Sequence, residues 1–191
     1  MYKNCKTPES AMRQYEFEQC LLHTMKHTAY SNISVTYLCA QIGIARKNFY
    51  RYFDNKEDVL LALIDHTISR YQKYKFPFPD NSNDLLIELE QYLTFWQDNS
   101  TLLEALEKNH LGTLLVERVL TFAWRLDIPI LYKEGTIKDP NRVIFVTSGL
   151  ITLIFTWHHG NYQTPKEELV LRIHRLLSAP IFNLNDSVKL D

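Results

Sequence analysis

The sequence predicts an all-α protein of about nine helices, and three observations support this fold class. Apolar residues recur at helical spacing along most of the 191 residues, glycine is scarce at 5 residues, and strand-like alternation is nearly absent. Hydrophobic residues make up 46% of the chain, which is enough for one large core or two small ones. We therefore expect helical domains whose limits follow from the breaks in the pattern.

A pair of short helices is predicted at the start of the most informative segment. Leu38 and Ile42 recur at helical spacing, and the Ser34 hydroxyl can accept from an unpaired amide in the first turn of a helix over 34–41. Gly43 ends this helix, because glycine takes a left-handed conformation without steric cost. A second helix after so short a turn is the helix-turn-helix pattern, whose second helix enters the major groove of DNA.

The second helix of the pair carries large apolar residues on one face only. Phe49 and Phe53 stand four residues apart and are expected to face the core. The other faces carry Arg46, Lys47, Asn48, Tyr50 and Arg51. After this segment, Asp54 or Asn55 can cap a further helix that begins near Lys56.

With these motifs, residues 33–60 resemble the DNA-binding domain of the tetracycline-repressor (TetR/AcrR) family. The shared features are Ser34, Gly43, the run Phe49-Tyr50-Arg51-Tyr52-Phe53, and Asn55-Lys56-Glu57 at the start of the fourth helix. Ala45 departs from the family, which commonly has a serine that caps the recognition helix. Lys47 and Asn48 occupy positions that are often small, so the family's usual pattern of base contacts does not carry over directly.

The resemblance implies a dimeric transcriptional regulator, most often a repressor, that reads a pseudo-palindromic operator in double-stranded DNA. In this family a small-molecule ligand usually releases the protein from DNA. The chain also resembles a subgroup with a long apolar penultimate helix, which includes regulators of dihydroxyacetone-kinase operons. The alternative for such a chain is a coactivator or protein-binding module without a small-molecule inducer of its own.

Seven residues are predicted to contact DNA: Ser34, Arg46, Lys47, Asn48, Tyr50, Tyr52 and Lys56. The three that open the recognition helix are the expected base readers, because Arg or Lys suits guanine and Asn suits adenine. The hydroxyl groups suit phosphate oxygens, as does the lysine at the positive end of its helix. Packing is the alternative role for the two tyrosines, and helix capping is the alternative role for the serine.

The distribution of charge agrees with DNA contact through the N-terminal part. Residues 1–75 carry 11 Lys/Arg against 7 Asp/Glu, a net of +4, whereas residues 76–191 carry 10 against 15, a net of −5. The three cysteines are odd in number and lack metal-type spacing, so Cys20 and Cys39 are expected to be small core residues. The N-terminus has no apolar signal segment, which indicates a cytoplasmic protein.

Further helices are predicted over 9–29, 56–75, 84–98, 100–108 and 110–126. The run Phe76-Pro77-Phe78-Pro79 and the polar residues after it interrupt the helical pattern. We therefore expect a DNA-binding helix-turn-helix domain with a linking helix over 1–75. The remainder, 76–191, is expected to be a helical domain for dimerisation and ligand binding.

Residues 143–157 are apolar nearly all round, which is typical of a helix buried on more than one side. A membrane span would need about 20 apolar residues, and Arg142 and His158 bound this stretch. A last helix begins near Pro165. In the resembling family the last two helices pair with those of a partner, so we expect a two-fold homodimer through residues 142–179. The alternative is a core helix of a monomer.

Six aromatic residues are candidates to line a ligand pocket, with plain core packing as the alternative: Tyr92, Phe95, Trp96, Phe122, Trp124 and Phe155. No Gly-rich phosphate loop, zinc motif or nucleophile elbow is present, so we expect neither an enzyme nor a cofactor. His23 and His27 have metal-ligand spacing but lack a third ligand nearby, so no metal site is expected.

Overall fold

A computed structural model describes residues 2–3, 7–72, 82–125 and 139–178, and every regular element in these ranges is a helix. The first elements are α1 (Pro8–Met25), the 3₁₀ helix η1 (Tyr30–Asn32), α2 (Val35–Gln41), α3 (Arg46–Phe49) and α4 (Lys56–Gln72). They are followed by α5 (Ser82–Asp98), α6 (Ser100–Lys108), α7 (Gly112–Arg125), α8 (Pro140–His159) and α9 (Lys166–Ser178). The all-α prediction is confirmed.

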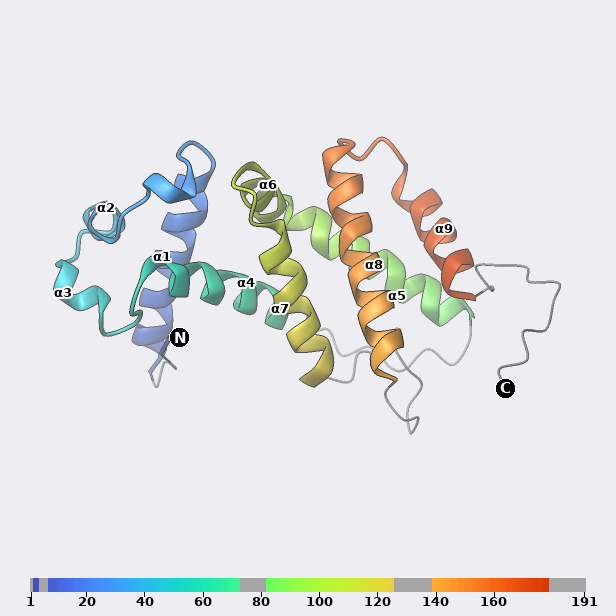
Figure 1. Cartoon of the computed structure of the whole chain (residues 1–191), viewed down its shortest axis with the longest axis horizontal. Helices are drawn as coiled ribbons and strands as arrows, with labels where there is room; N and C mark the ends of the chain where they lie inside the picture. Colours follow the sequence, from blue (N-terminus) through green and yellow to red (C-terminus); the bar gives the residue numbers. More distant parts are fainter. Residues whose placement is uncertain (1, 4–6, 73–81, 126–138, 179–191) are drawn as a thin grey trace, which may run out of the picture.

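The helices form two groups along the long axis of the molecule (Figure 1). In the N-terminal domain α1 packs on α4, and α2 packs on α3. In the C-terminal domain the main helix pairs are α5 with α9 and α7 with α8. Helices α6 and α7 lie between the two groups, because α6 also contacts α1 and α7 also contacts α4.

The core of the N-terminal domain is aromatic. Phe17 of α1 is fully buried together with Phe49 and Phe53, and the latter two rings stand edge-on to it at centroid distances of 5.2 and 5.8 Å. Such edge-to-face contacts add about 0.5–1.5 kcal/mol each to the free energy of burial. The prediction that Phe49 and Phe53 face the core is confirmed.

The first helix is shorter than predicted. It begins at Pro8, where the Thr7 hydroxyl accepts from the Ser10 amide at 3.2 Å, and it ends at Met25. Its predicted extension to residue 29 is wrong, because residues 26–29 turn into η1 and Thr24 accepts the amides of this turn.

Two other helices begin at residues different from those predicted. His110 has a φ of +57°, so the chain turns after α6, and the helix predicted from residue 110 begins at Gly112. Helix α5 begins at Ser82 rather than at residue 84. Residues 73–81, where the domain boundary is predicted, lie outside the described ranges.

A buried carboxylate joins the two domains. Asp65 in the middle of α4 is 3% exposed, and Arg118 of α7 donates to its two oxygens at 2.7 and 2.5 Å. The Tyr2 hydroxyl donates to the same carboxylate at 3.0 Å. Burial, reinforced by the charge of Asp65, raises the pKa of Tyr2 above its usual value. Because a buried carboxylate needs charged and neutral donors around it, α7 and the residues ahead of α1 are both held to α4.

Replacing Arg118 by Met should lower the free energy of unfolding by about 3–5 kcal/mol, because Asp65 then stays buried without its counter-charge. The double variant Asp65→Asn/Arg118→Met should recover part of this loss, since no buried charge remains. Denaturant titrations followed by tryptophan fluorescence measure both. A single variant that is no less stable than the double variant would contradict the assignment.

Candidate nucleic-acid interface

The turn between α2 and α3 has the predicted geometry. Ser34 caps α2, and its hydroxyl accepts from the Tyr37 amide at 3.1 Å. Gly43 has a φ of +70°, a conformation that a residue with a Cβ rarely adopts. The Ala45 side chain makes no capping hydrogen bond at the start of α3, as its departure from the family's serine predicts.

The polar residues of the recognition segment lie on its outer side. Arg46, Lys47 and Tyr50 are exposed, and Asn48 is half-buried. Arg46 Nε donates to the Tyr50 hydroxyl at 3.1 Å, and its guanidinium carbon lies 5.8 Å from the centre of that ring. The structure thus brings the three predicted base readers and one predicted phosphate contact together on a one-turn helix.

Tyr52 has a different environment from Tyr50. It is half-buried, and its ring packs near Phe17 at a centroid distance of 6.4 Å. Its backbone oxygen accepts from the Lys3 amide at 3.0 Å. This geometry favours the packing role for Tyr52, whereas Tyr50 is available to a ligand; the phosphate contact of either hydroxyl stays a prediction.

Lys56 turns toward its own chain. Its ammonium donates to the backbone oxygens of Tyr30 at 2.7 Å, Ser31 at 3.3 Å and Ile33 at 3.0 Å. It also lies 4.4 Å from the centre of the Tyr30 ring. A lysine has three donors, so these carbonyls engage all of them. Phosphate contact by Lys56 stays a prediction, and it requires that some of these hydrogen bonds break.

Asn55 and Asp58 build the start of α4. The Asp58 amide donates to the Asn55 side chain at 2.8 Å, and the Asp54 amide donates to the Asp58 carboxylate at 3.1 Å. This reciprocal arrangement fixes the turn that follows the recognition segment. The sequence named Asp54 or Asn55 as the cap, and the structure selects Asn55.

The N-terminal arm is a part of this surface that the sequence did not indicate. The Lys3 amide and side chain donate to the backbone oxygens of Tyr52 and Tyr50, at 3.0 and 2.5 Å. The Gln14 side chain of α1 donates to the Lys3 oxygen at 2.6 Å. The arm therefore lies beside the recognition segment and adds a cation there. No periodicity marks residues 2–3, so only the fold reveals this contact.

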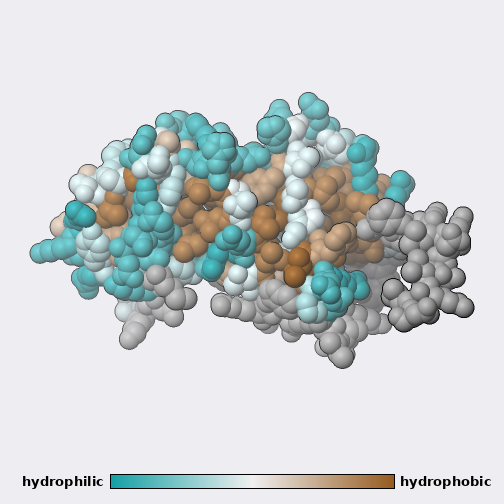
Figure 2. Space-filling model, in the orientation of Figure 1, coloured by the Kyte–Doolittle hydropathy of each residue, from teal (hydrophilic) through white to brown (hydrophobic). Residues whose placement is uncertain are grey.

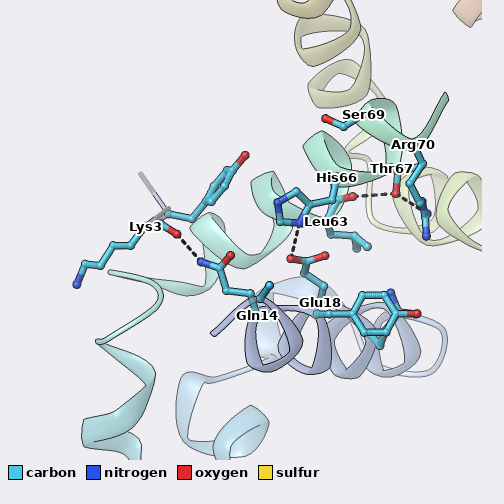
Figure 3. A pocket seen from close by; sticks show the side chains of 12 residues that line it. Lys3, Gln14, Glu18, Leu63, His66, Thr67, Ser69 and Arg70 are labelled. Carbon is cyan, nitrogen blue, oxygen red and sulfur yellow. Dashed lines mark hydrogen bonds and ion pairs between the residues drawn. The ribbon is translucent and has the colours of Figure 1, made fainter. Parts of the chain in front are cut away.

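A cleft of about 580 Å³ lies between α1, α4 and the arm (Figure 3). On its floor the nearly buried Glu18 of α1 faces His66 of α4, with 2.8 Å between a carboxylate oxygen and Nδ1. The hydrogen bond to Glu18 raises the pKa of His66 above its usual value, against the lowering effect of burial; the negative charges of Glu18 and Asp65 also raise it, and Arg70 opposes them. The partners are 48 residues apart, which explains why the sequence did not reveal the pair.

The aromatic residues proposed to line a ligand pocket divide into two places. Tyr92, Phe95 and Trp96 of α5 cluster beside Tyr71 of α4, with 5.6 Å between the Tyr71 and Tyr92 centroids and 5.1 Å between those of Tyr71 and Phe95. Phe155 lies elsewhere, against the start of α7. Phe122 is half-buried on α7, and the side chain of Trp124 is outside the described part. Their contact with a ligand stays a prediction.

Exposed apolar residues also occur on each of the last two helices. One side of α8 is buried, but Ile144 and Phe145 are 45% and 65% exposed, and a Cβ added to Gly149 would meet no atom within 4 Å. On α9, Leu171 and Leu176 are 49% and 54% exposed. Figure 2 shows hydrophobic residues over the middle of the molecule and beside α8, whereas the end formed by α1–α3 is mostly hydrophilic.

None of the helices in the described residues is both long and apolar enough to cross a membrane. Within the same ranges, no group of three or more His, Cys, Asp or Glu side chains is arranged to hold a metal ion, and the rings of His23 and His27 stand edge-on to each other with centres 5.9 Å apart.

The chain is similar to known regulators in its N-terminal sequence and in its whole fold. Residues 22–63 match the family model of bacterial regulatory proteins, tetR family. A solved structure described as a TetR-family transcriptional regulator from Syntrophomonas wolfei aligns with a TM-score of 0.67 at 19% identity, covering 92% of this chain and 99% of that chain. No curated protein sequence matches the chain.

Two further solved structures share the fold at lower similarity. The fatty acid degradation regulator FadR from Bacillus halodurans aligns with a TM-score of 0.57 at 18% identity, covering 93% of this chain and 98% of that chain. The dihydroxyacetone kinase operon activator DhaS has the same TM-score and identity, with coverages of 88% and 95%. At these identities the alignments establish the fold alone.

A helix-turn-helix with an exposed polar recognition turn, joined to a larger helical domain, defines the class of DNA-binding transcriptional regulators. Within this class, residues 22–63 form a DNA-binding domain of the TetR family, and the chain as a whole has the fold of TetR-family regulators. The sequence-based recognition of this family is confirmed.

The pair Glu18–His66 predicts a pH dependence of stability. The pKa of His66 in the folded chain exceeds its unfolded value of about 6.5, so the pair stabilises the fold fully below that pH and loses this effect as the pH rises through the raised pKa. The melting temperature should therefore fall from about pH 6 to pH 8.5, and His66→Gln should flatten that part of the profile. His23→Gln, at an exposed position of α1, is the control; an unchanged profile in the His66 variant would contradict this prediction.

Proposed function

We propose that this protein is a homodimeric repressor that binds a pseudo-palindromic operator in double-stranded DNA and leaves it when a small molecule binds. The observation that supports this most directly is the exposed polar turn of α3, which stands on buried Phe49 and Phe53 inside a TetR-family domain. Because its proposed target is operator DNA, we expect the protein to act in the cytoplasm. The domain limits of 1–75 and 76–191 remain part of this proposal.

Base reading is assigned to the start of α3. Arg46 and Lys47 carry donors for guanine, and Asn48 has the amide that suits adenine. Arg46 donates to Tyr50 in the free protein, so its guanidinium is already ordered along the outer side of the turn. Pre-ordering of this kind lowers the entropy that binding must remove from a long side chain.

Contact with the DNA phosphates is assigned to side chains around the residues that are proposed to read bases. The Ser34 hydroxyl is exposed at the start of α2, and Tyr50 offers a second hydroxyl at the end of α3. Tyr52 and Lys56 complete the predicted set, although their packing and hydrogen bonds within the chain must first rearrange. Phosphate contacts of this kind set the register on the duplex and do not read its sequence.

The dimer is assigned to the exposed face of α8 and α9. Its large apolar residues are Ile144, Phe145, Leu171 and Leu176. Gly149 leaves open space beside them, which lets a partner helix approach closely. A two-fold axis through this face would pair each helix with its own copy and set a fixed separation of two recognition helices.

Ligand release is assigned to the aromatic cluster beside the end of α4. The cluster of Tyr92, Phe95 and Trp96 lies against the end of α4, so a molecule bound beside it could act on the helix that carries the DNA-binding domain. For release, the ligand must bind one arrangement of the two domains more tightly than the other.

The decisive experiment is a selection of bound sequences from random duplex DNA with the purified full chain. A palindromic consensus with half-sites about one helical turn apart supports both DNA reading and the two-fold dimer. Recovery of no sequence above background, even at low salt, would instead favour the alternative of a coactivator or protein-binding module that has lost DNA binding.

Arg46→Ala should relax the choice at one base position of the selected operator, at a cost of about 1–3 kcal/mol on the preferred base. Affinities for single-base operator variants measure this effect. Arg51→Ala, which removes a neighbouring exposed cation outside the predicted base readers, is the control and should not change base preference. Uniform weakening on all operator variants by Arg46→Ala would make Arg46 a phosphate contact.

Phe145→Glu should raise the dissociation constant of the dimer by about 100-fold or more, because two unpaired charges would enter an apolar interface. Ile87→Glu is the matched control, since Ile87 is also an exposed apolar residue, at 53%, but lies on α5. Sedimentation equilibrium measures the two variants. A Phe145→Glu protein that stays dimeric would remove α8 from the interface.

A further inference from the structure

The end of α6 reaches the loop that leads into the helix-turn-helix. The Asn109 side chain follows the last turn of α6, and its oxygen accepts the backbone amide of Tyr30 at 2.6 Å. The amide nitrogen of the same side chain donates to the Ala105 oxygen at 2.7 Å and approaches the Met25 oxygen at 3.5 Å. One side chain of the C-terminal domain therefore contacts both the end of α1 and the start of η1.

The same loop is held from its other side by Lys56. The Tyr30 carbonyl accepts from Lys56 at 2.7 Å, and the Lys56 ammonium lies over the Tyr30 ring at 4.4 Å. The neighbouring carbonyls of Ser31 and Ile33 accept from the same ammonium. Tyr30 is thus bonded through its amide to the C-terminal domain and through its carbonyl to α4.

Two side chains also anchor the loop: Tyr30 is partly buried against the core, and Ile33, which follows η1, is 3% exposed. Helix η1 itself has three residues and no side-chain cap at Ala29. It runs directly through Ile33 into Ser34, the cap of α2. A shift of η1 therefore moves the start of α2 and the Ser34 hydroxyl, which is proposed to contact a DNA phosphate.

We propose that Asn109 and Lys56 are positioning residues that fix η1 from two sides, so that α6 of the C-terminal domain sets the pose of α2 on DNA. This inference rests on the proposed function and adds the residues through which the C-terminal domain acts on the DNA-binding domain. The 2.6 Å hydrogen bond between Asn109 and the Tyr30 amide would exceed hydrogen-bond range if α6 moved away by about 1 Å.

The test compares Asn109→Ala with Asn109→Asp, which retains an oxygen for the Tyr30 amide. Asn109→Ala should speed hydrogen exchange in residues 30–37 and weaken binding to the selected operator by about three- to tenfold, the size of one hydrogen bond. Asn109→Asp should restore only part of both, because its second oxygen faces the Ala105 carbonyl, to which the Asn109 amide nitrogen donates. Lys108→Ala is the control, because Lys108 donates to Lys26 of α1 and does not contact η1.

A second variant separates positioning by Lys56 from direct phosphate contact. Lys56→Met should weaken DNA binding and speed hydrogen exchange in η1, and the proposed phosphate contact should also lower the slope of log affinity against log salt by about one. A lower slope with unchanged exchange in η1 would make Lys56 a phosphate contact alone and overturn its positioning role.

Failure of the inference and failure of the proposed function give different results. If the wild-type chain selects an operator but Asn109→Ala changes neither exchange nor affinity, the positioning role is wrong while DNA binding stands. If the wild-type chain binds no DNA, the proposed function is wrong, and hydrogen exchange in residues 30–37 still decides whether Asn109 holds η1.

Discussion

The surface proposed to contact DNA depends on one constraint: a helix of a single turn is not stable by itself in water. Nucleating a helical turn is unfavourable, and α3 has no propagation and no side-chain cap to offset it. Phe49 and Phe53 supply what the helix lacks, because both rings are fully buried against Phe17. Large apolar anchors on the inner side leave the outer positions free to carry cations and amides. The recognition segment is therefore rigid through its burial, and its polar residues do not need to stabilise the fold.

Sequence reasoning succeeded where the physics is local. The Ser34 cap, the positive φ of Gly43 and the missing cap at Ala45 each follow from one residue and its backbone, and each is confirmed. It was less successful at helix ends such as residues 26–29, where a continued apolar pattern competes with a turn. Helical periodicity predicts which face of a helix is buried, but not which residues that face contacts.

The contacts that sequence reasoning missed are all between residues far apart in the chain. The pairs Glu18 with His66 and Asp65 with Arg118 are separated by 48 and 53 residues. Lys56 is a predicted DNA contact whose hydrogen-bond partners could not be read from the sequence. Its position at a helix start suggested a phosphate contact, whereas the fold brings three backbone carbonyls to its ammonium group. A charged side chain takes the strongest acceptors within reach, and only the tertiary structure says which those are.

These long-range contacts bear on how a signal can cross the molecule. Arg118 of α7 is bonded to the middle of α4, and Asn109 at the end of α6 is bonded to the loop before α2. The DNA-binding domain is thus joined to α6 and α7 at several separate points, among them a third hydrogen bond from Lys108 to Lys26, and the buried charge pair of Asp65 and Arg118 is costly to break. Free rotation about α4 alone would break these contacts. If the two DNA-binding domains of the proposed dimer change their separation, each domain is therefore expected to carry its α6 and α7 with it. These helices would then slide against α8, on which α7 packs. Because α8 also bears exposed apolar residues, a shift there would reach the partner subunit of the proposed dimer directly.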